Sequence, residues 1–368
     1  MTRATVLAIE TSCDETAVAI VRGREVLSSV VASQIEIHRR YGGVVPEVAS
    51  REHVGAVGTA IAQAIEQFSA QSSAQSSAQS SAQGDYGWNE IDAIAATCAP
   101  GLVGALMVGI TAAKTLAIVH GKPFLGVHHL EGHIYASYLS DPDLQPPFLC
   151  LLVSGGHTSF VHVRGPGDYA ILGKTRDDAA GEAFDKVARL LALGYPGGPE
   201  IDKLAKTGNP KAFPLPEGKI SLPGGGYHPY DASFSGLKTA VLRLTDKLKA
   251  ESLATKKPVP VADVAASFQF TVVKALVKRA IACAVDHDLS TIVVGGGVAA
   301  NSELRSRLTQ TAQQHDINVL FPPMKYCTDN AAMIACAAAA RYELGDRSAL
   351  SIGAQSKLSI TEAAALYE

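Results

Sequence analysis

Several features that would assign this chain to a specialised class of protein are missing from its sequence. The six cysteines are scattered with no Cys-x-x-Cys pair, which argues against a disulfide framework and against a zinc ribbon. The start of the chain lacks the basic, apolar and small-residue zones of a secretory signal and goes almost directly into an apolar strand at residues 6–9. The sequence therefore predicts a protein of the reducing cytoplasm.

An excess of charge of one sign is also missing. The chain has 32 basic and 35 acidic residues and a net charge of −3, so no overall electrostatic attraction to nucleic acid is expected. A local basic patch stays open, with Arg39, Arg40 and Arg51 as candidates. The alternative is that these arginines lie on an ordinary solvated surface.

The chain has no clean apolar run of membrane length. Residues 102–119 come near that length, but Lys114 interrupts them. Their alanine, glycine and threonine content suits a helix that is buried on both faces. We therefore expect a core helix there and no association with a membrane.

A P-loop lysine motif and a Gly-x-Ser-x-Gly nucleophile elbow are both absent. The glycine-rich residues 295–301 follow an apolar strand and fit the fingerprint G-x-G-x-x-A, which makes a nicotinamide dehydrogenase a rival hypothesis. That fingerprint expects an acidic residue at the end of the next strand, whereas Asp316 precedes the strand predicted at residues 317–321. The dehydrogenase hypothesis is therefore weakened, although the glycines still allow a nucleotide to approach the backbone.

The most informative feature that is present is a histidine pair, His129 and His133, four residues apart. On a helix, residues at this spacing share a face, so the two imidazoles can bind one metal ion. The alternative is that both are packed or surface histidines. Metalloproteases place a glutamate next to one of the ligands, whereas Glu131 lies midway between them, so a protease signature is a weak match.

A pattern of apolar strands and polar turns occurs twice along the chain. Residues 6–21 and residues 148–163 each read as a strand, a polar turn and a second strand, and each hairpin precedes another strand and then alternating helices and strands. This repetition predicts an α/β fold of two lobes, each a β-β-β-α-β-α unit, around a central cleft. The two small-residue turns would face each other across that cleft, where their N–H groups suit a phosphate.

The length of 368 residues suits two such lobes. We expect residues 1–126 to form the first lobe, residues 127–346 to form the second lobe with the metal and substrate site, and residues 347–368 to return to the first lobe. Residues 70–83 repeat Ala-Gln-Ser-Ser, which predicts a polar surface insertion in the first lobe or, alternatively, a weak extension of the preceding helix.

Seven blocks of sequence, taken together in their order, resemble the tRNA N6-adenosine threonylcarbamoyltransferase family of the bacterial TsaD type. The resemblance covers residues 4–344 apart from the repeat, and the C-terminal tail departs from the Arg-Trp-rich ending of many bacterial members. The family's fold resembles the actin, Hsp70 and sugar-kinase (ASKHA) group, in agreement with the duplicated unit. The blocks are residues 10–15 (ETSCDE), 48–53 (VASREH), 128–133 (HHLEGH), 152–157 (LVSGGH), 178–186 (DAAGEAFDK), 295–301 (GGGVAAN) and 327–332 (CTDNAA).

The resemblance implies that His129, His133 and Asp329 bind one divalent metal ion. Two imidazoles and one carboxylate leave positions open for a substrate, and this ligand set is compatible with Fe(II), which we favour, or with Zn(II). The alternative for Asp329 is the N-cap of the alanine-rich helix that follows it.

The resemblance also implies a substrate site. Gly155 and Gly156 would let backbone N–H groups approach an acyl or phosphoryl oxygen, and Asn301 would hydrogen-bond the nucleoside. Asp185 and Asp202 would accept hydrogen bonds from hydroxyl groups, the alternative being that they are solvent-facing helical carboxylates. The full set is Leu152, Val153, Ser154, Gly155, Gly156, Asp185, Gly198, Asp202 and Asn301.

The implied reaction is transfer of the threonylcarbamoyl group from threonylcarbamoyl-AMP to N6 of the adenosine 3′-adjacent to the anticodon, in tRNAs that read codons beginning with A, with release of AMP. The implied partners are tRNA and proteins of the TsaB and TsaE types. The general base stays open between Asp14, Glu15 and a metal-bound water. The rival hypotheses are a metal-dependent glycoprotein endopeptidase and a non-catalytic, Hsp70-like nucleotide switch, which would need no His-His-Asp metal site.

Overall fold

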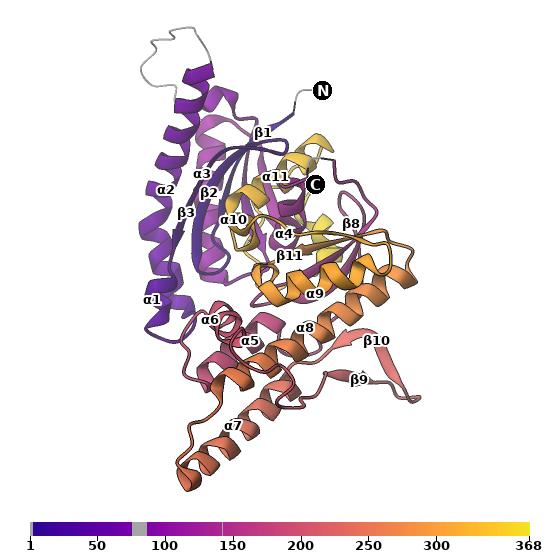
Figure 1. Ribbon diagram of the computed structural model, residues 1–368. Coiled ribbons are helices and arrows are strands. Elements are labelled where there is room, and N and C mark those ends of the chain that lie inside the picture. The colour runs from indigo at the N-terminus through magenta and orange to yellow at the C-terminus, as the bar shows by residue number, and fades with distance from the viewer. Residues whose placement is uncertain (1–2, 76–86, 142) are drawn as a thin grey trace.

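The computed structural model describes residues 3–75, 87–141 and 143–368, and its two lobes are each built on a five-stranded mixed sheet (Figure 1). In the first sheet, the central β1 pairs antiparallel with β2, which pairs antiparallel with β3, while β4 and β5 add in parallel on the other side. Every residue of β1 is buried, as expected for a strand covered on both faces. The order is β3, β2, β1, β4, β5, with bounds β1 Thr5–Glu10, β2 Glu15–Arg22, β3 Glu25–Ser33, β4 Ala93–Ala99 and β5 Phe124–His128.

The second sheet repeats the connectivity of the first. Its central strand β6 pairs antiparallel with β7, which pairs with β8, while β11 and β12 add in parallel on the other side. The predicted duplicated unit and the two-lobed ASKHA-type fold are therefore confirmed. The order is β8, β7, β6, β11, β12, with bounds β6 Phe148–Val153, β7 Thr158–Gly165, β8 Asp168–Lys174, β11 Thr291–Gly295 and β12 Asn318–Leu320.

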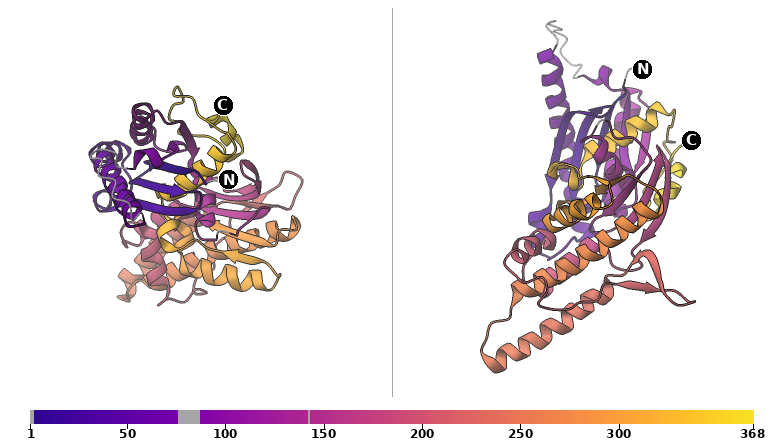
Figure 2. Two further views of the ribbon diagram at one scale, coloured as in Figure 1. Left: turned by 90° about the horizontal axis from the view of Figure 1, so that it is seen from above. Right: turned by 45° about the vertical axis from the view of Figure 1, so that its right-hand side comes forward.

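Helices α2 and α3 pack together on one face of the first sheet, and α11 covers the opposite face (Figures 1 and 2). Helix α11 is rich in alanine, and its small side chains allow close contact with β1, β2 and the buried helix α4. At the crossing of α4 with α11, a Cβ on Gly132 would lie 2.5 Å from Cδ1 of Ile334. The bounds are α1 Ile35–Arg39, α2 Pro46–Gln75, η1 Trp88–Glu90, α3 Val103–His120, α4 His129–Tyr138 and α11 Ala331–Glu343.

The second sheet is covered chiefly by α8, a long and mostly buried helix that packs against α6 and α9, while α7 projects away at the lower end of the molecule (Figure 1). The remaining bounds are α5 Ala180–Leu190, α6 Gly197–Ala205, β9 Lys219–Ser221, β10 Tyr227–Ala232, α7 Ser235–Thr255, α8 Val261–Asp286, η2 Gly297–Ala300, α9 Ser302–Gln313, α10 Met324–Cys327 and η3 Ile360–Leu366.

A shared hydrophobic core joins the two lobes. It contains Val6 of the first sheet, Leu152 of the second, and Ile134 and Ile334 from the crossing of α4 and α11. Each lobe has a further core on its outer side. Helices α4 and α11 therefore lie where the lobes meet, and the predicted histidine pair is carried by one of them.

The expectation that residues 102–119 form a helix buried on both faces is wrong. Among the described residues, α3 is the one helix long and apolar enough to cross a membrane by length and composition. It packs on β4 and beside α2, which buries Leu106 and Ile110, but Met107, Ile118 and Val119 are exposed. The reason is that α3 lies on the outer face of its sheet, where nothing in the described chain covers its second side.

The Ala-Gln-Ser-Ser repeat begins inside α2, so residues 70–75 extend the helix, and residues 76–83 lie outside the described part of the chain. The C-terminal tail contacts the first lobe. Nζ of Lys114 on α3 donates to the carbonyl of Ile352, and the N–H of Gln355 donates to the carbonyl of Cys98 on β4 at 2.9 Å. We propose residues 1–126 and 127–346 as the two lobes, with residues 347–368 returning to the first. These contacts support that division.

Candidate metal centre and substrate cleft

The histidine pair is positioned by the turn from β5 into α4. His128, the last residue of β5, caps the helix because its Nδ1 accepts from the N–H of Leu130 at 3.2 Å, while its Nε2 lies 3.1 Å from the carbonyl of Leu358. Burial lowers the pKa of His128 to about 4, so this ring is neutral and can accept. The helix therefore begins at His129, and His133 follows one turn later on the same face.

Asp329 completes a compact set of three ligand atoms. Its Oδ1 lies 3.2 Å from Nε2 of His133 and 3.5 Å from Nε2 of His129, and the ligand atoms of the three residues all lie within 4.8 Å of one another. The alternative role of Asp329 as a helix cap is wrong. Asn330 caps α11 instead, because its Oδ1 accepts from the N–H of Met333 at 3.0 Å, which leaves the Asp329 carboxylate facing the imidazoles.

The three side chains fit a metal ion. Two ligands bound tetrahedrally at 2.0–2.1 Å lie about 3.4 Å apart, and the separations from Asp329 are 3.5 Å and 3.2 Å. Both ring nitrogens of His133 are buried and, among the described residues, have no hydrogen-bond partner. The polar neighbour of Nε2 is the Asp329 carboxylate at 3.2 Å, and a cation between the rings and that carboxylate would bind this buried nitrogen.

Glu10, at the end of β1, is a site residue that sequence reasoning missed. It is fully buried, and its Oε2 lies 3.1 Å from Nδ1 of His129 and accepts from the hydroxyl of Thr97 at 2.6 Å. This contact orients His129 so that Nε2 faces Asp329. Burial lowers the pKa of His129, but the nearby Asp329 and Glu10 carboxylates outweigh this effect and raise the pKa to about 9.

The turn that follows β1 also reaches the histidine pair. The hydroxyl of Ser12 lies 3.1 Å from Nδ1 of His129. Burial raises the pKa of Asp14 from its ordinary value, and it raises the pKa of Glu15 to about 7. One carboxylate oxygen of Glu15 is hydrogen-bonded by Ser33 at 2.9 Å, while the other is buried without a partner among the described residues.

The equivalent turn after β6 lies on the other side of the same centre. The N–H of Ser154 donates to the carbonyl of His157 at 2.8 Å, which closes the turn and leaves Gly155 and Gly156 exposed. Burial, followed by the nearby His129 and His133, lowers the pKa of His157 to about 4. Both predicted turns therefore converge on the histidine pair, as a cleft between duplicated lobes requires.

Helices α5 and α6 carry two more predicted substrate residues, and Asp185 lies near enough to Asp14 for the two charges to interact. The carboxylate of Asp185 accepts from the N–H of Gly197 at 2.7 Å, and burial raises its pKa. Gly198 stands in open space, since a Cβ built on it would meet nothing within 4 Å. One turn before Asp185, at the start of α5, the N–H of Gly181 donates to the carbonyl of Ser154 at 3.1 Å.

Asp202 and Asn301 meet at the start of α9. Asn301 caps that helix because its Oδ1 accepts from the N–H of Leu304 at 2.9 Å, and its Nδ2 donates to Gln269 at 2.8 Å. Asp202 accepts from the hydroxyl of Ser302 at 2.9 Å. Both residues therefore have a structural role in holding the end of α9, and their roles in substrate binding stay predictions.

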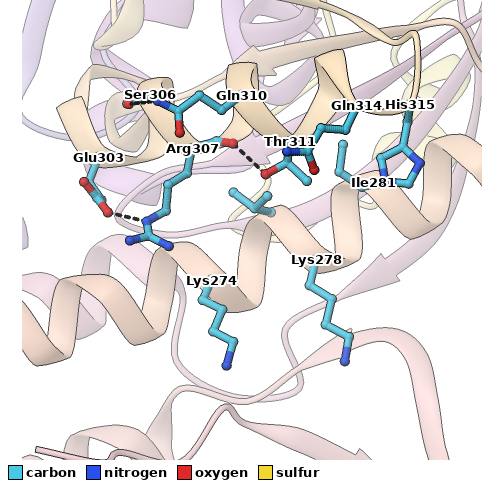
Figure 3. Close-up of a pocket in the computed structure, with 11 residues that line it drawn as sticks. Lys274, Lys278, Ile281, Glu303, Ser306, Arg307, Gln310, Thr311, Gln314 and His315 are labelled. Atoms are coloured by element: carbon cyan, nitrogen blue, oxygen red, sulfur yellow. Dashed lines mark hydrogen bonds and ion pairs between the residues drawn. The ribbon is translucent and has the colours of Figure 1, made fainter. Parts of the chain in front are cut away.

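A separate groove of about 590 Å³ runs between α8 and α9 (Figure 3). Lys274 and Lys278 line it from α8, and Arg307, which is ion-paired with Glu303, lines it from α9. None of its lining residues belongs to the metal-ligand set or to the predicted substrate set. The groove is therefore not part of the cleft described above.

The duplicated sheets and the His-His-Asp set where the lobes meet define a two-lobed, ASKHA-type enzyme with a candidate metal centre. The chain is similar in structure to a full-length HypF crystallised with phosphate and nucleotide, with a TM-score of 0.59 and 13% sequence identity over 93% of this chain and 47% of that chain. It is similarly related to HypF of T. kodakarensis, with a TM-score of 0.57 and 14% identity. The chain thus spans about half the length of these proteins, and the likeness concerns the fold alone.

Sequence comparison identifies the family. The model of TsaD, tRNA N6-adenosine threonylcarbamoyltransferase, matches residues 25–336. Proteins of that name from Synechocystis sp. and Nostoc punctiforme are each 66% identical to this chain, over 365 and 363 residues, covering 99% of this chain and 99% and 98% of theirs. The chain belongs to the tRNA N6-adenosine threonylcarbamoyltransferase family, which confirms the resemblance of its seven blocks and removes the dehydrogenase hypothesis.

Proposed function

We propose that this chain transfers the threonylcarbamoyl group of threonylcarbamoyl-AMP to N6 of the adenosine 3′-adjacent to the anticodon, in tRNAs that read codons beginning with A. The N6 amine attacks the carbamoyl carbon, a C–N bond forms, the bond to the phosphate oxygen breaks, and AMP leaves. The observation that carries this proposal is family membership over nearly the full chain, at 66% identity. The donor is an activated mixed anhydride, so the protein mainly has to orient the reactants and stabilise charge.

We propose that the transferase depends on one divalent metal ion held by His129, His133 and Asp329, with Fe(II) favoured over Zn(II). The spacing of the ligand atoms, and the burial of His133 with its Nε2 facing the Asp329 carboxylate at 3.2 Å, support this assignment. When bound, such an ion supplies a Lewis acid for oxygen atoms of the donor. Glu10 keeps His129 in the ligating orientation through its Nδ1 contact of 3.1 Å.

We assign donor binding to the turn after β6. The exposed Gly155 and Gly156 offer backbone N–H groups without a side chain in front of them. Asp185 and Asp202 accept from hydroxyl groups, and Asn301 retains a second amide hydrogen for the nucleoside, beyond the one that it gives to Gln269. The complete proposed set is Leu152, Val153, Ser154, Gly155, Gly156, Asp185, Gly198, Asp202 and Asn301.

Among the candidate bases, we favour Glu15 for accepting the proton that leaves N6. A general base works best when its pKa lies near the working pH, and the pKa of Glu15 is about 7. One of its carboxylate oxygens is buried and, among the described residues, accepts no hydrogen bond, so no donor competes for the proton that it would take up. Asp14 is the second candidate, because burial raises its pKa as well.

The glycoprotein endopeptidase hypothesis requires a base beside the metal ligands, and Glu131 is the residue that a protease would use. Its carboxylate instead accepts from the hydroxyl of Tyr169 at 2.6 Å and is ion-paired with Arg341 at 2.8 Å. Glu131 is therefore committed to a buried ion pair. Incubating metal-loaded protein with a glycoprotein would test the remaining possibility directly.

We further propose that the protein acts in the cytoplasm, together with tRNA and with partners of the TsaB and TsaE types. Family membership supports these assignments.

The function is tested by depleting the protein from cells and measuring threonylcarbamoyladenosine in digested tRNA by mass spectrometry. We expect the modified nucleoside to disappear and to return with the wild-type chain, but not with the double variant His129→Ala and His133→Ala. His315→Ala, which changes an exposed histidine, is the control. The purified double variant should also retain no bound metal. Full modification by a metal-free double variant would refute the metal role, and unchanged modification after depletion would refute the function.

A further inference from the structure

The loop between α1 and α2, on the first lobe, contacts the second lobe. Nε of Arg39, on the first lobe, donates to the carbonyl of Tyr195 at 3.1 Å, and Arg189, on the second lobe, donates to the carbonyl of Gly42. Two arginines thus reach across the lobes in opposite directions. The loop is therefore held beside the segment that connects α5 and α6.

Two exposed side chains stand on this loop, Arg40 and Tyr41. The Tyr41 side chain is 59% exposed, although most large apolar side chains of the protein are buried. Among the described residues, neither side chain makes a hydrogen bond, ion pair or ring contact. The backbone beneath them is anchored, because the N–H groups of Tyr41 and Gly43 both donate to the carbonyl of the buried His38.

The loop lies close to the proposed reaction centre. Immediately before α1, the N–H of Gln34 donates to the carbonyl of Asp14 at 3.0 Å. Tyr195, which Arg39 contacts, is near enough to Asp14 and Asp185 that, after burial, their charges raise its pKa. The loop that carries Arg40 and Tyr41 is therefore attached on both lobes to segments that lie next to Asp14 and Asp185.

The arginines around this loop differ in how far they are neutralised. Arg39 is ion-paired with Glu36 at 2.8 Å, and Arg51 is ion-paired with Glu47 at 2.6 Å. Arg40 and Arg189 have no carboxylate partner within ion-pair distance among the described residues. The guanidinium of Arg40 is therefore available to an anionic ligand, despite the net charge of −3 of the chain, while that of Arg189 donates to Gly42 and keeps its other N–H groups for such a ligand.

We propose that this arginine rim, which consists of Arg39, Arg40, Tyr41, Arg51 and Arg189, binds the anticodon loop of the tRNA substrate. Arg40 and Arg189 contact phosphates, and the ring of Tyr41 stacks on an unpaired base next to the target adenosine. Proteins recognise RNA sequence mainly in single-stranded loops, through phosphate contacts and through aromatic stacking on splayed bases. The inference rests on the proposed function, because it assumes that the adenosine enters this cleft.

The groove between α8 and α9 is the competing basic surface, and its features fit RNA less well. Lys274 is ion-paired with Glu217 at 2.5 Å, and the guanidinium of Arg307 lies over the ring of Phe270 and is ion-paired with Glu303. Figure 3 shows the side chains of Lys274 and Lys278 pointing away from α9. None of the groove's lining residues is aromatic apart from His315.

The test measures binding of unmodified tRNA to the full chain assembled with its partner proteins, at several salt concentrations. We expect Tyr41→Ala to weaken binding about tenfold and Tyr41→Phe to keep it, because stacking needs the ring and not the hydroxyl. Arg40→Gln should flatten the dependence of log affinity on log salt by about 0.7, the value for one phosphate contact on a single strand. The matched controls are Tyr227→Ala, at 58% exposure, and the exposed Arg243→Gln.

Threonylcarbamoyl-AMP affinity and tRNA modification are measured on the same proteins. The rim inference is overturned if the wild-type complex modifies tRNA while Tyr41→Ala and Arg40→Gln bind tRNA as tightly as the wild type. It is equally overturned if Lys278→Gln, in the groove between α8 and α9, loses tRNA affinity and the rim variants do not. A third contradicting result is that the rim variants lose affinity for threonylcarbamoyl-AMP to the same extent as affinity for tRNA, since that would show a disturbed donor site. If the wild-type complex fails to modify tRNA, the proposed function itself is wrong.

Discussion

At the scale of single residues, the buried carboxylate of Glu15 makes the proposed reaction dependent on pH. Burial raises its pKa from 4.5 to about 7, so the ionised form that can accept a proton is populated only as the pH rises through about 7. We expect the rate of transfer to rise through that range in the wild-type protein. Glu15→Gln should lower the rate and remove this rise, which single-turnover rates measured across pH would show.

The same residue has an effect of known sign on stability. A carboxyl group whose pKa is higher in the folded state favours folding while it is protonated, and this advantage is lost as the pH rises from 4.5 towards 7. The free energy of unfolding should therefore fall less steeply with pH in Glu15→Gln. A wild-type rate profile that is flat across pH 7, or a variant that keeps the rise, would contradict the assignment of the base.

Prediction from the sequence succeeded for the placement of residues that depends on local spacing. His129 and His133 share a helix face because they are four residues apart, and Asp329 meets them as the family resemblance implied. Glu10 could not be found in this way, because its contact with His129 joins residues 119 positions apart, and nothing in the local sequence distinguishes it from other strand-end carboxylates. Its role follows only from the folded structure, in which the end of β1 meets the start of α4 through this contact.

At the scale of elements, α5 supports the turn after β6 through backbone contact at Gly181. A Cβ at this position would lie 2.6 Å from the carbonyl oxygen of Ser154 and 2.8 Å from the nitrogen of Gly155, and backbone atoms cannot swing aside as a side chain would. We expect Gly181→Ala to lower the free energy of unfolding by about 1–3 kcal/mol and to weaken donor binding. Urea unfolding and a donor titration would measure both effects.

The matched control for this prediction is Gly58→Ala on α2, where a Cβ would meet nothing within 4 Å. Because alanine favours a helix more than glycine does, this change should stabilise the protein by up to about 1 kcal/mol. If both variants were equally stable and bound the donor equally well, the turn would not depend on its contact with α5.

The elements themselves were largely predictable because the strands are apolar runs bounded by polar turns. The hairpin of β1 and β2 and the hairpin of β6 and β7 both lie at the predicted residues. The prediction for α3 failed because amino-acid composition shows how apolar a helix is, but not how many of its sides another element covers. Met107 and Val119 are exposed for that reason.

At the scale of the whole molecule, a buried ion pair joins the helices where the two lobes meet. Glu131 on α4 and Arg341 on α11 are 2.8 Å apart, and their side chains are 0% and 6% exposed. We expect Arg341→Met to lower the free energy of unfolding by about 3–5 kcal/mol, because it leaves a buried carboxylate without its counter-charge. The double variant Arg341→Met and Glu131→Gln should recover part of this loss. Urea unfolding would measure the free energy of unfolding of both variants.

The exposed pair of Arg22 and Glu90, at 3.4 Å, provides the control. Arg22→Met should cost less than about 1 kcal/mol, since water screens a surface ion pair. Equal losses at the two sites would show that burial does not determine the strength of the pair at the junction of the lobes.

All ten residues of α4 are buried, and this determines how the proposed ion would be exchanged. The side chains of His133 and His129 are 1% and 8% exposed, whereas that of Asp329 is 23% exposed. A chelator can therefore approach only from the Asp329 side, while the imidazoles stay shielded behind it. Ion removal would then depend on access at that carboxylate, and a substrate bound next to Asp329 would protect the ion from extraction.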